Sequence, residues 1–408
     1  MSQSLKVLQI VPSFSLVYGG PSQMVRGFSQ ALAAAGAVVT VATTDSNGDV
    51  DEAPLDVPLA QPVAHDNYTV WYFRCSPFRR YKFSTGLLRW LWHHASDYDI
   101  AHVHALFSPV SSLAAAVLRQ RGVPYLLRPL GTLDPADLQK KKQLKQLYAA
   151  ALERPNIAGA AAIHFTSAQE ASVSERFGTQ TPGIVLPLGV TPLPASGTTI
   201  DVRDRFNIPG DRPLLLFMSR LDPKKGLDLL LPALETLRQE GLNFHLLLCG
   251  ANPQDRQYEQ SIYTQIQNSP LQPYATLTGF VAGDLKTALL KTADLFVLPS
   301  YYENFGISVA EAMLAGLSVV ISDQVHIWQD IQQSQSGWIC TCSQASLTEQ
   351  LRDALKSPEE RRQRGYNAQK AAQERYSWSA IAEGAIATYH SILSDQPLPS
   401  AIAVNNSP

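Results

Sequence analysis

The strongest constraint on the fold is a repeated alternation of short apolar runs with segments of helical period. Strands joined through helices to further parallel strands require right-handed crossovers, so this pattern predicts mostly parallel sheets covered by helices. A first series of runs falls at residues 6–11, 38–43, 69–73, 100–105, 125–129, 162–166 and 183–188. A second series falls at 214–219, 244–249, 275–281, 295–300, 318–322 and 337–341. We therefore expect two Rossmann-like α/β domains.

The amino-acid composition changes between the two series of apolar runs. Residues 190–213 are rich in Pro, Gly, Ser and Thr, which is typical of a linker with a short helical piece. A chain of 408 residues can bury two cores of roughly 150 to 200 residues each. We expect an N-terminal domain over residues 1–190, a linker over 191–213 and a C-terminal domain over 214–375. A last amphipathic helix over 376–395 is expected to join the N-terminal domain.

Bulk charge and cysteine content narrow the function classes. The net charge of −2 gives no general electrostatic reason to bind nucleic acid, so an anionic ligand must be held by local charges. Two of the four cysteines, Cys340 and Cys342, lie close together without a second pair that would complete a tetrahedral metal site; the others are Cys75 and Cys249. We expect neither a metal nor a cofactor.

The first residues and the longest apolar runs bear on location. The start, MSQSLKVLQIVPSFS, has too short an apolar core for a signal peptide, and no run approaches the roughly 20 residues of a membrane span. We expect a cytoplasmic protein, either free or peripheral at the inner face of the membrane.

The stretch YYENFGISVAE follows the apolar run at 295–300 and presents polar residues at a predicted strand end. In open α/β folds this edge of the sheet is where ligands bind. A simpler interpretation is also available: Ser308 and Glu311 fit a capping box, and Gly306 fits a turn with positive φ.

A second polar segment, RLDPKKG, follows the apolar run at 214–219. Arg220 leaves the strand end and Lys225 precedes the next helix, so both can point toward the helix start near 306–308. An arginine, a lysine and unpaired helix N–H groups form an anion site that suits a diphosphate. The alternative is a pair of exposed surface cations.

These elements together resemble the retaining glycosyltransferases of family 4, which have the GT-B fold, over nearly the whole chain. Residues 303–311 carry the family's two glutamates with seven residues between them, and RLDPKKG stands upstream at the expected place. The N-terminal half adds YGG at 18–20 and DIAHVH at 99–104, and LGTLDP at 130–135 resembles a subgroup that glycosylates polysaccharide precursors. The resemblance implies two Rossmann-like parallel-sheet domains that face each other across a cleft.

The resemblance also implies a set of site residues. Glu303 would lie beside the donor sugar, Glu311 would hydrogen-bond both ribose hydroxyls, and Arg220 with Lys225 would hold the diphosphate. The implied donor-binding set is Gly19, Gly20, Arg220, Lys225, Gly250, Val281, Glu303, Asn304, Phe305, Gly306, Ile307, Ser308 and Glu311. The implied catalytic set is Glu303, Arg220, Lys225 and His104.

Two positions depart from the family pattern. Many members have His-Gly where this chain has Leu130-Gly131, so the histidine that contacts the donor sugar is replaced. His104, at the end of the apolar run 100–105, is a candidate substitute, although a histidine at a strand end is more often structural. An asparagine also commonly precedes the glycine that is Gly189 here, a change expected to affect only the hinge turn.

The expected function is retaining transfer of a sugar from a nucleotide diphosphate sugar to an acceptor hydroxyl, in polysaccharide or glycolipid biosynthesis. Fixed cations would stabilise the leaving diphosphate without a metal. The alternatives are a nucleotide-sugar epimerase on the same scaffold and a non-catalytic protein that binds glycans or nucleotides. A NAD-dependent dehydrogenase is disfavoured because VYGGPS at 17–22 lacks the dinucleotide-binding spacing.

Two segments of the first domain interleave cations with aromatic or apolar residues. They are FRRYKFSTGLLRWLW at 78–92 and KKKQLKQLY at 140–148. Such a composition suits the headgroup region of an anionic membrane, which would make the acceptor lipid-linked. The alternative is that the aromatics pack in the core while the cations are solvated.

Overall fold

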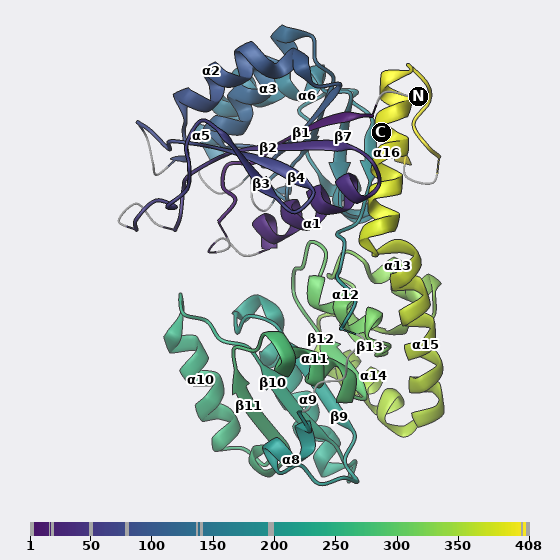
Figure 1. The fold of residues 1–408 in the computed structure, drawn as a ribbon. Coiled ribbons are helices and arrows are strands. Elements are labelled where there is room, and N and C mark those ends of the chain that lie inside the picture. The colour runs from purple at the N-terminus through teal and green to yellow at the C-terminus, as the bar shows by residue number, and fades with distance from the viewer. Residues whose placement is uncertain are drawn as a thin grey trace. The chain divides into compact units, whose positions relative to one another are not determined.

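The computed structural model describes residues 4–15, 17, 20–48, 52–77, 81–135, 138, 142–194, 200–400 and 403–404. These residues divide into two compact units. The first holds the described chain up to Gly189 and again from Trp378 onward, and the second holds Val190–Ser377 (Figure 1). The last long helix, α16 (Trp378–Leu393), therefore packs in the unit formed by the first half of the chain.

The first unit is built on a sheet with the strand order β15-β8-β7-β6-β5-β1-β2-β4-β3. All its described pairs are parallel except β3 with β4 and β15 with β8. All predicted runs of the first series are strands; the two antiparallel edge strands were not predicted, because both are short and β3 has no buried residue. The strands are β1 (Lys6–Ile10), β2 (Val38–Thr44), β3 (Pro62–His65), β4 (Tyr68–Phe73), β5 (Ile100–His104), β6 (Tyr125–Arg128), β7 (Ala162–Phe165), β8 (Gly183–Val185) and β15 (Ala403–Val404).

Helices cover both faces of this sheet, as the parallel topology requires. One apolar core joins the sheet to α1 (Gly20–Ala34) and α16. The other core joins the opposite face to α2 (Thr85–His94), α3 (Pro109–Arg121), α6 (Arg154–Gly159) and α7 (Ala168–Val173) (Figure 1). A short helix, α5 (Lys142–Tyr148), runs into a π-helical segment, Ala149–Glu153.

A buried polar layer of a few side chains lies within this packing, on the face of the first sheet that α1 and α16 cover. His164 donates from Nε2 to the carbonyl of Leu186 at 2.7 Å and accepts at Nδ1 from Nε2 of His102 at 3.0 Å. His102 in turn accepts at Nδ1 from the hydroxyl of Tyr389 at 2.8 Å. One set of neutral tautomers satisfies all three bonds. This layer therefore favours uncharged imidazoles.

The second unit has a six-stranded, wholly parallel sheet with the order β11-β10-β9-β12-β13-β14. All predicted runs of the second series are strands, and the segment predicted as a linker contains the short helix α8 (Val202–Phe206). The strands are β9 (Leu214–Met218), β10 (His245–Cys249), β11 (Ala275–Gly279), β12 (Leu295–Leu298), β13 (Val319–Ser322) and β14 (Gly337–Cys340). The remaining helices are α9 (Leu227–Gln239), α10 (Arg256–Gln267), α11 (Gly283–Thr292), α12 (Ile307–Leu314), α13 (Trp328–Gln333), α14 (Gln344–Lys356) and α15 (Pro358–Arg375).

Helix length and hydropathy also bear on membrane insertion. Within the part of the chain that the structure describes, no helix is both long enough and apolar enough to span a bilayer.

The buried histidines predict acid-sensitive stability of the first unit. Burial lowers the pKa of His102 to about 3, and burial with nearby positive charge lowers the pKa of His104 and His164 well below 6.5. The unfolded chain binds these protons near pH 6.5 and the native chain does not, so the stability is present above pH 6.5 and is lost as pH falls. Each group approaches a slope of about 1.4 kcal/mol per pH unit only below pH 6.5, so the three together lose about 4 kcal/mol between about pH 7.5 and 5.5. Hydrogen exchange of the β5 amides at these two pH values, corrected for the intrinsic exchange rate at each pH, gives the opening free energy and so measures the loss.

A variant with His164→Gln should lose about a third of this pH dependence, whereas the exposed His390→Gln should keep all of it. Equal opening free energies at the two pH values would show that the histidines are not neutral in the native state.

Candidate active site

The candidate site lies at the switch point of the second sheet. In the order β11-β10-β9-β12-β13-β14, the chain runs from β9 outward to β10 and β11, then returns to β12 on the other side of β9 and continues outward to β13 and β14. The carboxyl ends of β9 and β12 are therefore adjacent, and the crevice outside two such ends is where open α/β sheets bind ligands. The segments that leave these strands are the two polar segments singled out from the sequence.

Lys225 and Glu303 meet at this switch point. The ammonium of Lys225, in the loop after β9, forms an ion pair with Oε2 of Glu303, in the loop after β12. Their side chains are 14% and 22% exposed, so the pair is mostly shielded but still reachable. The structure thus brings together a cation and a carboxylate separated by 78 residues of sequence.

Arg220 lies at the same strand end but makes a different contact. Its Nη1 donates to Oε1 of Gln254, in the loop after β10, at 3.3 Å, and the side chain is exposed. Sequence reasoning gave no reason to single out Gln254, because a glutamine in a loop carries no spacing signal. Arg220 and Lys225 therefore flank the switch point from one loop while they contact different neighbours.

The loop that carries Lys225 depends on a glycine. Gly226 has φ +71°, and a Cβ at this position would stand 2.1 Å from the carbonyl oxygen of Pro299. The amide of Tyr301 also donates to the carbonyl of Lys224 at 2.8 Å. The two loops are thus joined through their backbones, which fixes where Lys225 and Glu303 leave the chain.

Helix α12 begins directly beside Glu303. Its N-cap is Gly306, at φ +82° and ψ 63°, and no side chain caps the helix. The capping box of Ser308 and Glu311 is therefore not formed. The amides of Ile307 and Ser308 lie in the first turn, where backbone N–H groups have no partner inside the helix and favour an anion.

Glu311 contacts a lysine that sequence reasoning missed. Lys286, on α11, donates from Nζ to Oε1 of Glu311 at 2.6 Å. Both side chains are partly exposed. The contact orients the carboxylate from one side, and only a spatial argument could have found it, because the two residues lie on different helices.

The ends of β10 and β11 complete this edge of the sheet. A Cβ on Gly250 would stand 1.9 Å from the carbonyl oxygen of Ser219, so the backbones after β10 and β9 approach closely there. The amide of Gly250 donates to the carbonyl of Gly279 at 2.8 Å, and Val281 is buried just beyond. Gly250 and Val281 thus follow neighbouring strand ends, although no described contact joins them to Glu303.

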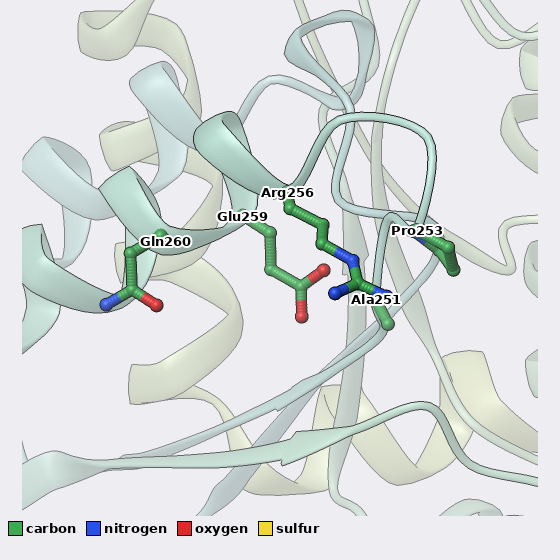
Figure 2. A pocket seen from close by; sticks show the side chains of 5 residues that line it. All are labelled: Ala251, Pro253, Arg256, Glu259 and Gln260. Carbon is green, nitrogen blue, oxygen red and sulfur yellow. The ribbon is translucent and has the colours of Figure 1, made fainter.

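A pocket of about 370 Å³ opens beside the loop after β10. It is lined by Ala251, Pro253, Arg256, Glu259 and Gln260. Figure 2 shows the guanidinium of Arg256 lying beside the carboxylate of Glu259, near Ala251 and Pro253. Oε2 of Glu259 accepts from the amide of Asn252 at 2.7 Å, so this carboxylate holds the loop in place.

The first unit was expected to contribute Gly19, Gly20 and His104 to the site, and the structure describes only the last two of these residues. Gly20 is the first residue of α1, whereas Gly19 lies outside the described residues. His104 is fully buried; its Nε2 lies 2.6 Å from Oε1 of Gln9, and its ring stacks on that of His102. The structure therefore places His104 in the polar layer of the core and not at a surface that a sugar could reach.

The turn that carries Leu130 is held from inside the first unit. Leu130 and Gly131 have φ +56° and +77°. The amide of Gly131 donates to Oε1 of Glu170 at 3.0 Å, and the other oxygen of this carboxylate accepts from the amide and hydroxyl of Thr166. The turn is thus shaped by a buried carboxylate.

The described residues contain no group of three or more His, Cys, Asp or Glu side chains arranged to hold a metal ion. Positive charge at the switch point comes from Arg220, Lys225 and the first turn of α12. This fold and this site define a two-unit α/β protein whose second unit has a strand edge with cationic side chains and a helix start, a combination that suits an anion.

Comparison with known proteins gives the family. The model for glycosyl transferases group 1 matches residues 199–371, and the model for the glycosyl transferase 4-like domain matches residues 19–189. Together they cover most of the chain, including both polar segments of the switch point. The chain belongs to the glycosyltransferases of this group 1 and 4-like type, and the predicted family is confirmed.

Relatives agree with this assignment. An uncharacterized glycosyltransferase of Methanocaldococcus jannaschii is 30% identical over 191 residues, which is 47% of this chain and only about half, 48%, of the relative. A phosphatidyl-myo-inositol mannosyltransferase of Mycobacterium tuberculosis is 25% identical over 332 residues, 74% of this chain and 76% of the relative. The Anabaena protein HepE, solved in complex with UDP and glucose, superposes with a TM-score of 0.67 at 18% identity over 95% of this chain and all of HepE. This likeness shows the GT-B fold.

The close approach at Gly226 gives a test of the loop geometry. Gly226→Ala should destabilise the second unit by about 2 kcal/mol or more, because it adds a backbone clash to the cost of a left-handed residue. Gly241→Ala is the matched control: it also has positive φ, at +84°, but a Cβ there meets nothing within 4 Å. Urea unfolding compares the two variants, and equal losses would show that the contact with Pro299 does not constrain the loop.

Proposed function

We propose that this protein transfers a sugar, with retention of anomeric configuration, from a nucleotide diphosphate sugar to an acceptor hydroxyl. The observation that carries the proposal is the pairing of Lys225 with Glu303 at the switch point, beside the uncapped start of α12. A cation, a carboxylate and free helix amides at one strand edge suit the diphosphate and the sugar of such a donor.

The diphosphate is assigned to Arg220, Lys225 and the amides of Ile307 and Ser308. Lys225 now neutralises Glu303, and a bound diphosphate would offer the same ammonium a second anionic partner. Such fixed cations oppose the negative charge that grows on the leaving group more strongly in the transition state than in the ground state. No divalent ion is needed in this scheme, because the protein itself supplies the positive charge.

The nucleoside is assigned to Glu311 and the strand ends beyond it. Oε1 of Glu311 is engaged by Lys286, and a carboxylate retains acceptor capacity for the ribose hydroxyls. Gly250 and Val281 would bring backbone close to the nucleotide. HepE, which has the same fold, is solved in complex with UDP and glucose, which supports a nucleoside diphosphate as the ligand here.

The chemistry assigned to the sugar is a displacement on one face. The bond from the anomeric carbon to the diphosphate breaks with its electron pair going to the phosphate, the acceptor oxygen bonds to the same face, and its proton passes to a phosphate oxygen. Glu303 is the one nucleophile candidate at the described switch point, and its ion pair with Lys225 favours a role in positioning the sugar over a covalent role. His104 is not included, because it is buried.

The acceptor is assigned to the first unit, and we propose that it is a lipid-linked precursor of a polysaccharide or glycolipid. Leu144 and Leu147 on α5 are 64% and 73% exposed, on a segment that also carries lysines. The aromatic residues of the segment at 78–92 differ in exposure. Tyr81 is 60% exposed, but Trp90 packs against Trp71 and Phe73 in the core. Phe78, Arg79, Arg80, Lys140 and Lys141 lie outside the described residues. The proposed location is cytoplasmic, at the inner face of the membrane.

Donor turnover tests the site. With a panel of nucleotide sugars in the presence of EDTA, the protein should release nucleoside diphosphate, and Lys225→Ala or Arg220→Ala should lower the rate about 100-fold, or about 3 kcal/mol, as for other preorganised charges. Lys291→Ala is a matched control, because Lys291 lies in the same unit and contacts only the carbonyl of Pro194 among described partners.

Three outcomes would contradict parts of this proposal. Near-normal turnover in both variants would show that the diphosphate is held elsewhere. Activity that appears only with Mg²⁺ or Mn²⁺ would contradict the metal-independent scheme. An isomeric nucleotide sugar formed without acceptor would favour an epimerase.

Vesicle binding tests the acceptor side. Leu144→Ser with Leu147→Ser should weaken co-sedimentation with anionic vesicles at least about 10-fold, because each leucine buried in the interface contributes about 1.5 kcal/mol or more. Val173→Ser, also exposed on the first unit, is the control. If the wild-type protein binds anionic vesicles no better than neutral ones at low salt, the acceptor is soluble.

A further inference from the structure

The chain crosses between the two units at two places that are bonded to each other. One crossing lies at Gly189 and Val190, and the other at Ser377 and Trp378. The amide of Val190 donates to the carbonyl of Tyr376 at 2.8 Å, and Val190 forms an isolated parallel bridge with Ser377. Tyr376 therefore holds the first crossing by its backbone while it begins the second.

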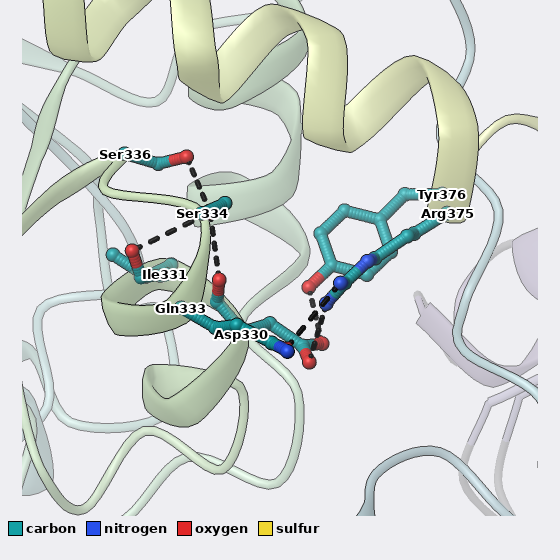
Figure 3. A network of polar contacts seen from close by, with 7 residues as sticks. All are labelled: Asp330, Ile331, Gln333, Ser334, Ser336, Arg375 and Tyr376. Carbon is teal, nitrogen blue, oxygen red and sulfur yellow. Dashed lines mark hydrogen bonds and ion pairs between the residues drawn. The ribbon is translucent and has the colours of Figure 1, made fainter.

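The side chain of Tyr376 is anchored inside the second unit. It is fully buried, and its hydroxyl donates to Oδ2 of Asp330, on α13, at 2.8 Å. Arg375 donates from Nη1 to the other oxygen of Asp330 at 2.9 Å, as Figure 3 shows. Burial and the neighbouring Asp330 raise the pKa of Tyr376 well above 10, so the phenol stays a donor. The ring thus has a fixed position relative to α13.

The same ring contacts the proposed donor loop. Tyr376 packs edge to face against Phe305, with ring centroids 5.3 Å apart and an interplanar angle of 80°. Phe305 is only 2% exposed, and it lies between Glu303 and Gly306, the residues assigned to the sugar. A displacement of the Tyr376 ring must therefore move Phe305 or open a void beneath it.

A second route joins the same elements through the backbone. The amide of Glu303 donates to the carbonyl of Gln324 at 3.1 Å, and the amide of His326 donates to the carbonyl of Glu303 at 3.0 Å. These residues lead directly into α13, which carries Asp330. The side chain of Phe305 contacts Tyr376 itself, and the backbone of Glu303 is bonded to the segment that leads into α13, to which Tyr376 is hydrogen-bonded.

Trp378, two residues after Tyr376, is anchored in the first unit as Tyr376 is anchored in the second. The ring of Trp378 lies against Gly189 and against Gly27 of α1, where an added Cβ would stand 2.2 Å from its atoms in both cases. The tripeptide Tyr376-Ser377-Trp378 therefore carries one aromatic anchor in each unit.

We propose that Tyr376 is a positioning residue for the donor-sugar loop, and that it couples the crossing between the units to Phe305 and Glu303. The catalytic consequence of this inference rests on the proposed function, because the proposed function assigns the 303–306 loop to the donor sugar. A change of backbone at the crossing is transmitted through a ring that is held at its hydroxyl by Asp330 and packed against Phe305. The predicted effect falls on turnover and not on the affinity for the nucleoside diphosphate.

Three variants test the proposal. Tyr376→Leu removes both the ring contact and the hydrogen bond, and Tyr376→Phe keeps the ring and removes the bond. Tyr366→Leu is the matched control, because Tyr366 lies on α15, the helix that ends just before Tyr376, but is 66% exposed. Each full-length variant is compared for the affinity of UDP and GDP by calorimetry, the kcat of donor hydrolysis, and the amide exchange of residues 303–308.

Tyr376→Leu should lower kcat about 10-fold or more, because a small displacement at the reacting sugar is costly, and should leave UDP and GDP affinity within about 3-fold. It should also speed exchange at 303–308, with Tyr376→Phe intermediate and Tyr366→Leu unchanged. Unchanged kcat and exchange in Tyr376→Leu would overturn the proposal. Equal losses of kcat and nucleotide affinity, with exchange raised throughout the second unit, would overturn it in favour of a merely structural role.

The proposed function can fail separately. If the wild-type protein neither binds UDP or GDP nor hydrolyses any donor, the donor assignment is wrong. The exchange measurement then still decides whether Tyr376 holds the 303–308 loop.

Discussion

The structure of the site depends on one contact, the ion pair between Lys225 and Glu303. It joins the loop that follows β9 to the loop that follows β12, at the point where the strand order of the second sheet reverses. The pair does not stand alone, because the backbone of Gly226 lies against Pro299 and the amide of Tyr301 is bonded to Lys224. Close backbone contact thus fixes where Lys225 and Glu303 leave the chain, which brings their charged ends within reach of each other.

This arrangement would let a protein with a net charge of −2 hold the diphosphate that we propose as its ligand. The positive charge is local: two cationic side chains and the first turn of one helix converge on a single strand edge. Within the described switch point each charge has a neighbour that holds it, Glu303 for Lys225, Gln254 for Arg220 and Lys286 for Glu311. Such preorganised charges need little rearrangement when a ligand binds, which is the property that electrostatic catalysis requires.

The architecture followed from the sequence because buried parallel strands are continuous apolar runs. The edge strands β3 and β15 were missed, because an edge is defined by its partner and not by its own hydropathy. The site was predictable as far as strand ends determine it, so the loop that carries Lys225 was placed at the same edge of the sheet as the helix start beside Glu303. Their neighbours were not predictable, since Lys286 and Gln254 come from other helices and loops. The alternative of a capping box is not formed, because Gly306, a glycine with positive φ, is the N-cap. The candidate role of His104 as the histidine that contacts the sugar is contradicted by its burial, because the face of β5 that carries it is covered by α1 and α16.

The central claim is that the switch point of the second unit binds a diphosphate. Calorimetric titration of the wild-type protein with UDP, GDP, uridine and guanosine measures this directly, since the paired ligands differ only in the phosphates. The account predicts that at least one nucleoside diphosphate binds about 100-fold or more tightly than its nucleoside, which corresponds to about 2.7 kcal/mol from charge-assisted contacts. Equal affinity for the nucleoside and its diphosphate would contradict it.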